Sequence, residues 1–228
     1  MNTIEKAQNL VKELLDSDNS GHGMDHTNRV MALSLKFAES EPANHEVVAL
    51  IALLHDVDDY KLFGSENAET LANAKDILKK CDVDEDIKKQ VIEAIKTIGY
   101  SKRLRGIVPS TIEAEIVSDA DMCDGMGATG ILRSHQYNLA HHRLFFDKNV
   151  FPILDMSAEE YKAKNDGTVV THIFEKILRL KDLMLTEAGR TEAAKRHDFV
   201  VKFLYQFFEE ENVPEWTEYL NNYRKPIK

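Results

Sequence analysis

His55 and Asp56 are the pair best suited to chemistry in this sequence, because they close an unbroken apolar run at 47–54. An aliphatic run belongs in a protein core, where an unpaired carboxylate is costly and is normally paired with another charge or bound to a metal. Neutral imidazole nitrogens and carboxylate oxygens are both ordinary metal ligands. The pair therefore predicts a metal site, with a helix C-cap and a hydrogen-bonded histidine as the alternative.

Two further residues are chemically awkward in the helices expected around them. His26 follows Asp25, a plausible N-cap, and Asp121 lies where an otherwise apolar helix turns acidic. Adjacent helical residues point about 100° apart, so His55 and Asp56 can share one ion only in a terminal turn. The loop expected after Asp56 permits this arrangement.

The elements that position these residues are expected to be helices, because apolar residues recur at helical spacing and no long strand-like alternation occurs. The predicted helices cover about 4–15, 25–41, 47–56, 66–78, 83–98, 111–124, a segment through 133–135, 168–187 and 191–211. A basic loop is expected at 99–109, and an ordered connection with some helix at 143–166. The pattern predicts an all-α protein with one domain over residues 1–228.

Composition narrows the function classes. The chain has 228 residues, of which 43% are hydrophobic and 30% charged, as in an ordinary globular protein. Its net charge of −10 argues against a binder of polymeric nucleic acid or anionic membranes, but leaves room for a small phosphorylated substrate. Two cysteines are too few for a disulfide framework, and no secretory signal or membrane span is apparent. We expect a cytoplasmic protein, with a homodimer as an open alternative.

The order His, then His-Asp, then Asp on successive predicted helices resembles the HD superfamily of metal-dependent phosphohydrolases. More narrowly, it resembles a bacterial subfamily of small HD hydrolases. The strings that carry this resemblance lie at 21–30, 53–61, 119–131 and 172–197, and the likeness extends over about 14–208. It implies an HD-domain helical bundle, with a metal-site core at about 22–125 and C-terminal helices at 168–211 packing on it.

Residue by residue, the resemblance implies four metal ligands: His26, His55, Asp56 and Asp121. A mixed nitrogen and oxygen donor set indicates manganese, magnesium or ferrous iron (Mn²⁺, Mg²⁺ or Fe²⁺). Two departures from the family pattern occur. Gly23 stands where relatives usually have an acidic residue, and Met122-Cys123 replaces an arginine and a leucine.

The implied activity is hydrolysis of a small phosphorylated metabolite, above all a nucleotide, by attack of metal-activated water. The enzyme is expected to be a nucleoside triphosphate pyrophosphohydrolase or a phosphatase. Asp59 is the candidate proton handler, with Lys61 beside it as a catalytic cation. The candidate substrate-binding cations, which face developing phosphoryl charge, are Arg29, Lys102, Arg133 and Lys176.

Other interpretations stay open for several of these residues. Asp59 and the basic residues at 102–105 are as readily explained as surface charges. Asp119 and Asp124 are expected to be solvated or to cap helices rather than to take part in catalysis. The alternative functions are a phosphomonoesterase or phosphodiesterase acting on another small substrate, and a non-catalytic protein that binds a metal or a nucleotide.

Overall fold

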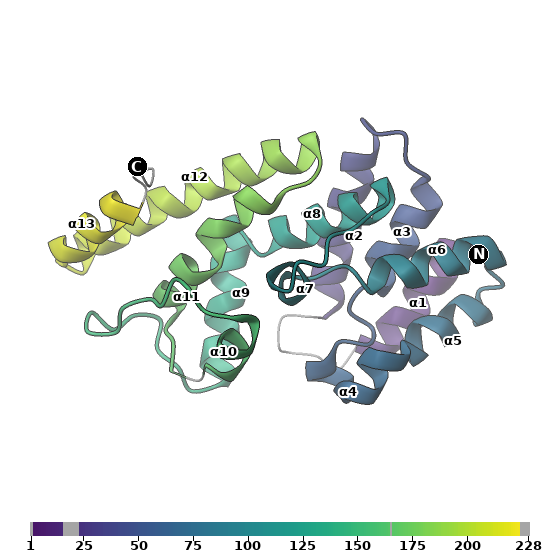
Figure 1. Ribbon diagram of the computed structural model, residues 1–228, viewed down its shortest axis with the longest axis horizontal. Coiled ribbons are helices and arrows are strands. Elements are labelled where there is room, and N and C mark those ends of the chain that lie inside the picture. Colours follow the sequence, from purple (N-terminus) through teal and green to yellow (C-terminus); the bar gives the residue numbers. More distant parts are fainter. Residues whose placement is uncertain (1, 16–22, 165, 224–228) are drawn as a thin grey trace. The chain divides into compact units, whose positions relative to one another are not determined.

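The computed structural model describes residues 2–15, 23–164 and 166–223, apart from the side chains of residues 61, 158, 161 and 162. These residues form helices and no β-strand, so the all-α prediction is confirmed (Figure 1). The chain divides into two compact units. Unit 1 comprises Met1–Asp124 and Leu183–Arg190, and unit 2 comprises Gly125–Asp182 and Thr191–Lys228. The extent of a single domain over 1–228, with helices 168–211 packing on the core, stays a prediction.

Unit 1 is built around a helix that is buried on all sides. Helix α3 packs against α1, α2, α6 and α8, and every residue from Val47 to Leu54 is buried. A helix that is apolar all round must lie inside a core, and this one places His55 and Asp56 at its carboxyl end. The helices of this unit are α1 (Thr3–Leu15), α2 (Met24–Ala38), α3 (His45–Leu54), α4 (Tyr60–Thr70), α5 (Ala72–Lys80), α6 (Glu85–Ile95), α7 (Tyr100–Leu104) and α8 (Ile112–Asp124).

Hydrogen bonds fix both ends of the central helix. At its start, the Asn44 side chain accepts from the N–H groups of Glu46 and Val47, at 3.0 and 3.3 Å. After its end, the buried Asp58 carboxylate accepts from the backbone N–H groups of Asn73 (3.0 Å) and Ala74 (2.9 Å). Free N–H groups at a helix start need such acceptors. Asp58 therefore fastens the turn that carries His55 and Asp56 to the start of α5.

The prediction of one helix over 66–78 is wrong, because the chain breaks within it. Leu71 has a left-handed backbone with φ of 53°, and it separates α4 from α5. Gly64 interrupts α4 itself with φ of 83°. The helical spacing of apolar residues continues across Leu71, so the sequence pattern gives no sign of the break. The break needs no local capping side chain, because the remote Asp58 supplies the acceptor.

Three smaller expectations also require correction. Helix α2 begins at Met24 with Gly23 as its N-cap, so Asp25 lies in the first turn and is not the cap. The basic loop at 99–109 contains the short helix α7. The predicted helix at 168–187 is α11 (Val169–Glu175) followed by the 3₁₀-helix η1 (Ile177–Leu183). Ile177 and Leu180 are both buried, and a spacing of three places side chains on one face of a 3₁₀-helix.

Asp119 in α8 is deeply buried, which contradicts the expectation that it is solvated. Its carboxylate accepts hydrogen bonds from the Leu185 N–H at 3.0 Å, the Thr186 N–H at 2.7 Å and the Thr186 hydroxyl at 2.8 Å. Burial raises the pKa of Asp119, while those hydrogen bonds and the charge of Arg103 act in the opposite direction. The segment Leu183–Arg190 thus belongs to unit 1 through a buried polar contact.

Unit 2 has an aromatic core around the fully buried Trp216. The rings of Phe146, Phe151, Phe174 and Phe208 have centroids 4.6–6.0 Å from that of Trp216. The helices of unit 2 are α9 (Gly127–Ala140), α10 (Ala158–Ala163), α11, α13 (Pro214–Tyr223), most of η1, and α12 (Glu187–Glu210) from Thr191 onward. Among the described residues, none of the helices combines the length and hydropathy that a membrane crossing requires.

We predict that Asp58→Ala destabilises the protein by about 1–3 kcal/mol, because it leaves the N–H groups of Asn73 and Ala74 without their acceptor. Urea denaturation followed by circular dichroism measures the free energy of unfolding. The control is Asp76→Ala, whose half-exposed side chain pairs with Lys80 on the surface and should matter by less than about 0.5 kcal/mol. Equal losses in the two variants would contradict the role given to Asp58.

Candidate metal centre

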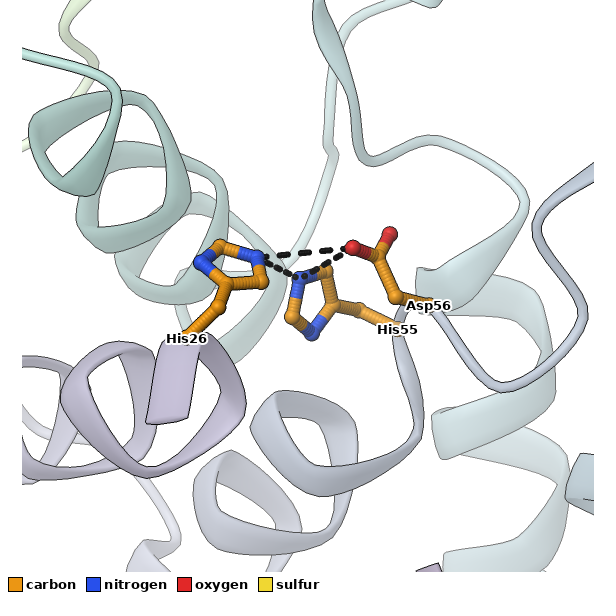
Figure 2. A group of neighbouring side chains, drawn as sticks. All are labelled: His26, His55 and Asp56. Atoms are coloured by element: carbon orange, nitrogen blue, oxygen red, sulfur yellow. Dashed lines mark hydrogen bonds and ion pairs between the residues drawn. The ribbon is translucent and has the colours of Figure 1, made fainter. Parts of the chain in front are cut away.

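Three helix ends or turns of unit 1 bring the predicted ligands together. His26 lies in the first turn of α2, His55 and Asp56 directly follow α3, and Asp121 lies in the last turns of α8. Helix α2 packs against both α3 and α8, which explains why residues far apart in sequence meet here. Figure 2 shows His26, His55 and Asp56 pointing toward one another.

The donor atoms lie at distances suited to a shared ion. The two Nε2 atoms of His26 and His55 are 3.2 Å apart, and Asp56 Oδ2 lies 3.4 and 3.6 Å from them. Asp121 Oδ1 lies 3.6 Å from His26 Nε2 and 3.9 Å from His55 Nε2. Ligand atoms about 2 Å from one ion are separated by roughly 3–3.5 Å in tetrahedral geometry. The separations among His26, His55 and Asp56, at 3.2–3.6 Å, are close to that range, and Asp121 lies beside this group of three, near the two histidines.

The other ring nitrogen of each histidine is engaged by an acceptor. His55 Nδ1 lies 2.8 Å from the carbonyl oxygen of Ala52, and a carbonyl only accepts, so this nitrogen carries the proton. His26 Nδ1 lies 2.8 Å from Asp124 Oδ2. In a neutral imidazole with its proton on Nδ1, Nε2 keeps a lone pair. Both histidines therefore direct lone pairs at the same point as the two carboxylates.

Asp124 is held in turn by Arg29. The Arg29 Nε donates to Asp124 Oδ1 at 2.7 Å, and Nη2 donates to Oδ2 at 3.1 Å, which is a bidentate pairing. This hydrogen bond raises the pKa of Arg29, partly offset by burial. Asp124 is buried and Arg29 is 41% exposed. The expectation that Asp124 is solvated or only caps a helix is therefore wrong.

This arrangement fits a divalent cation on the chemistry of its donors. The nitrogens of His26 and His55 converge with an oxygen of Asp56, and Asp121 Oδ1 lies within 3.9 Å of both nitrogens. A positive charge between these groups would relieve their mutual repulsion. The histidine side chains are about 1% exposed, whereas those of Asp56 and Asp121 are 18% and 23% exposed. The candidate site is therefore walled by imidazoles and open to solvent on its carboxylate side.

Asp59, Lys61 and Lys102 are the other predicted site residues of unit 1. Asp59 directly precedes α4, is half-buried, and its N–H donates to the carbonyl of Asp56 at 3.1 Å. Lys102 lies in α7 and is half-buried. Lys61 lies in α4, but its side chain is outside the described residues. The roles of all three residues stay predictions.

Arg133 and Lys176 belong to unit 2, where Arg133 lies in α9 and Lys176 is the C-cap of α11. Both side chains are half-buried. Their expected contribution to substrate binding stays a prediction.

Sequence reasoning missed the functional position of Asp124, although a signal for it exists. Residues three apart on a helix share a face, so Asp121 and Asp124 in α8 point to the same side. A metal-binding histidine usually donates its second nitrogen to a carboxylate or a carbonyl. A second acidic residue one turn beyond a predicted ligand is therefore a candidate for that partner.

Comparison with known proteins agrees with this geometry. The model of the HD domain matches residues 23–126, which include all four predicted ligands. YpgQ of Bacillus subtilis is 30% identical over 212 residues, which cover 92% of this chain and 93% of YpgQ. A crystal structure of YpgQ in complex with ADP has a TM-score of 0.70 at 26% identity, and covers 91% of this chain and 97% of that chain.

Two other solved structures are similar over most of the chain. A protein from Lactobacillus plantarum has a TM-score of 0.81 at 30% identity, and an HD-superfamily hydrolase from Bacillus thuringiensis has a TM-score of 0.70 at 32% identity. Each comparison covers 92% of this chain and 97% of the other. Together with the grouping of His26, His55 and Asp56, the comparisons show that this chain belongs to the HD superfamily of metal-dependent hydrolases.

Proposed function

We propose that this hydrolase cleaves a phosphate ester or anhydride bond of a small phosphorylated metabolite, and that the metabolite is a nucleotide. The observation that carries the proposal is the convergence of His26, His55 and Asp56, with Asp121 Oδ1 at 3.6 and 3.9 Å from the two imidazole Nε2 atoms. Such a centre suits substrates whose negative charge needs neutralising.

The proposed ligands are His26, His55, Asp56 and Asp121. A divalent cation held by them would lower the pKa of a bound water and would neutralise phosphate charge. Two imidazole nitrogens favour Mn²⁺ or Fe²⁺ over Mg²⁺, which prefers oxygen donors. The partial exposure of Asp56 and Asp121 leaves the carboxylate side of the site accessible to a substrate.

The residues around the proposed ligands supply orientation and charge. Asp124 keeps the proton of His26 on Nδ1, and so keeps Nε2 available for a cation. Arg29 is fixed by Asp124 through two nitrogens and remains 41% exposed, so the rest of its guanidinium can meet a phosphoryl oxygen. Asp59 follows Asp56 by one turn, and we assign it the orientation of the attacking water.

A nucleotide is favoured over other phosphorylated metabolites because the relative YpgQ has been crystallised with ADP. Hydrolysis of a nucleoside triphosphate yields either pyrophosphate or orthophosphate, and both products are compatible with the centre. A phosphomonoesterase or phosphodiesterase acting on another small substrate remains the second candidate, since the donor groups do not depend on the base or sugar.

A substrate panel tests this proposal. Purified protein freed of metal is incubated with Mn²⁺, Fe²⁺ or Mg²⁺ and with nucleoside tri-, di- and monophosphates, sugar phosphates and a phosphodiester. We expect release of pyrophosphate or orthophosphate from nucleotides, and a greater rate with Mn²⁺ or Fe²⁺ than with Mg²⁺. Metal binding without turnover of any nucleotide would refute the proposed substrate class.

We predict that His55→Ala and Asp121→Ala abolish nucleotide hydrolysis and weaken Mn²⁺ binding by about 100-fold or more, since each removes a donor atom from the centre. Isothermal titration of metal-free protein with Mn²⁺ measures the dissociation constant. His45→Ala is the control, because His45 is an exposed histidine at the other end of the same helix. Unaltered Mn²⁺ affinity in both ligand variants would show that the centre lies elsewhere.

Variants of Asp124 and Arg29 should affect metal affinity and catalytic turnover to different extents. Asp124→Asn is expected to weaken Mn²⁺ binding by about 10–100-fold, because an amide supports the Nδ1 proton of His26 less well. Arg29→Gln should reduce kcat/KM for a nucleotide by about 100-fold with a smaller effect on Mn²⁺ affinity. Lys36→Gln, at an exposed position on the same helix, is the control. If Arg29→Gln retained full activity, Arg29 would be a support for Asp124 alone.

A further inference from the structure

The segment Leu183–Arg190 is part of unit 1 although it is separated from the rest of that unit by Gly125–Asp182. It makes polar contacts with two helices of unit 1. Arg103 of α7 donates from Nη2 to the carbonyl of Leu183 at 2.8 Å. The N–H groups of Leu185 and Thr186 donate to Asp119 of α8. The segment is therefore fixed by groups on the unit that carries the metal centre.

Asp119 lies on α8 two residues before the proposed ligand Asp121. Residues two apart on an α-helix point about 200° away from each other, so Asp119 and Asp121 occupy opposite sides of α8. On one side, Asp121 and Asp124 meet the histidines. On the other side, Asp119 is held by Thr186 through both its N–H and its hydroxyl. The rotation of α8 about its axis is thus set from both sides.

The contact around Asp119 leaves little space for adjustment. A Cβ atom added to Gly189 would lie 2.2 Å from Asp119 Oδ2 and 2.7 Å from its Cγ. One turn further along α8, Cys123 Sγ lies 3.9 Å from the carbonyl oxygen of Gly189 and 4.0 Å from Met184 Sδ. The segment therefore follows α8 closely over the same turns that carry Asp121 and Asp124.

We propose that Leu183–Arg190 is an integral support of the metal centre, and that Asp119 is a positioning residue that holds α8 so that Asp121 and Asp124 meet His26. The proposal rests on the proposed function only in taking His26, His55, Asp56 and Asp121 as metal ligands. It extends the functional part of the chain beyond residues 23–126, which match the HD-domain model.

Coupling of this kind is reciprocal. If order in Leu183–Arg190 raises the affinity of the centre for a cation, then cation binding must increase order in Leu183–Arg190 by the same free energy. A segment that only stabilises the fold lacks this link. If Leu183–Arg190 only stabilised the fold, weakening its contacts would lower the melting temperature and leave the metal dissociation constant unchanged.

Variants at Asp119 and Thr186 test whether the contact with Leu183–Arg190 raises the affinity of the centre for a cation. Thr186→Val removes the hydroxyl that donates to Asp119 and keeps the side-chain shape, and Asp119→Asn removes the charge. We expect both to weaken Mn²⁺ binding by about tenfold, measured by calorimetry on metal-free protein well below each melting temperature. Thr186→Ser retains the hydroxyl and Glu187→Gln alters an exposed neighbour, so both should bind Mn²⁺ within about twofold of the parent. Lowered melting temperatures with unchanged Mn²⁺ affinity would overturn the proposal.

Hydrogen exchange on the unaltered protein tests whether cation binding increases order in Leu183–Arg190. This measurement does not depend on whether a variant folds. Saturating Mn²⁺ should slow exchange of the amides of Leu185 and Thr186, in peptides covering 183–190, together with peptides containing His26 and His55. Slowed exchange at His26 and His55 with no change at 183–190 would refute the coupling.

These outcomes are distinguishable from failure of the proposed function. Protein that binds Mn²⁺ but hydrolyses no nucleotide would refute the substrate class and leave both tests of the coupling valid. Protein that binds neither Mn²⁺ nor another divalent cation would refute the centre and the coupling together.

Discussion

The carboxylate of Asp124 is the group on which the geometry of this site depends. It accepts from His26 Nδ1 on one side and from two nitrogens of Arg29 on the other. A single buried charge thereby fixes the tautomer of His26 and the direction of the exposed guanidinium. A buried carboxylate without these partners is costly, so His26, Arg29 and Asp124 stabilise one another as a set. Asp124 therefore supports both the histidine of the proposed metal centre and the arginine whose positive charge lies beside it.

Much of the candidate site could be predicted because its signals are local. The apolar run before His55 predicts a buried helix, and a polar pair at its end indicates a special environment. The structure groups His26, His55 and Asp56, with Asp121 near both histidines, and the role of these four residues as ligands, which the resemblance to the HD superfamily implies, stays a prediction. Helices α1, α3 and α8 follow from apolar spacing in the same way. The all-α class and the HD superfamily are both confirmed.

What the sequence could not show depends on partners distant along the chain. Asp58 and Asp119 resemble surface acids, and nothing nearby in sequence indicates that Asn73 or Thr186 donates to them. The break at Leu71 is hidden for the same reason, since its compensating acceptor comes from Asp58. The chain divides into two compact units, and no change in composition marks Gly125 or Leu183 as a boundary between them. Long-range hydrogen bonds leave no periodic trace in a sequence.

The discontinuity of unit 1 has a consequence for folding during synthesis. When α8 emerges from the ribosome, the donors for Asp119 do not yet exist, because Leu185 and Thr186 follow the whole of Gly125–Asp182. Translation adds about 5–20 residues each second. The Asp119 carboxylate of α8 therefore lacks these hydrogen-bond donors for several seconds, while the following residues up to Thr186 are synthesised. Until then that carboxylate is better left in water than buried. The last turns of α8, and with them the proposed ligand Asp121 and its neighbour Asp124, are thus expected to reach their final packing late, after most of unit 2 has been made.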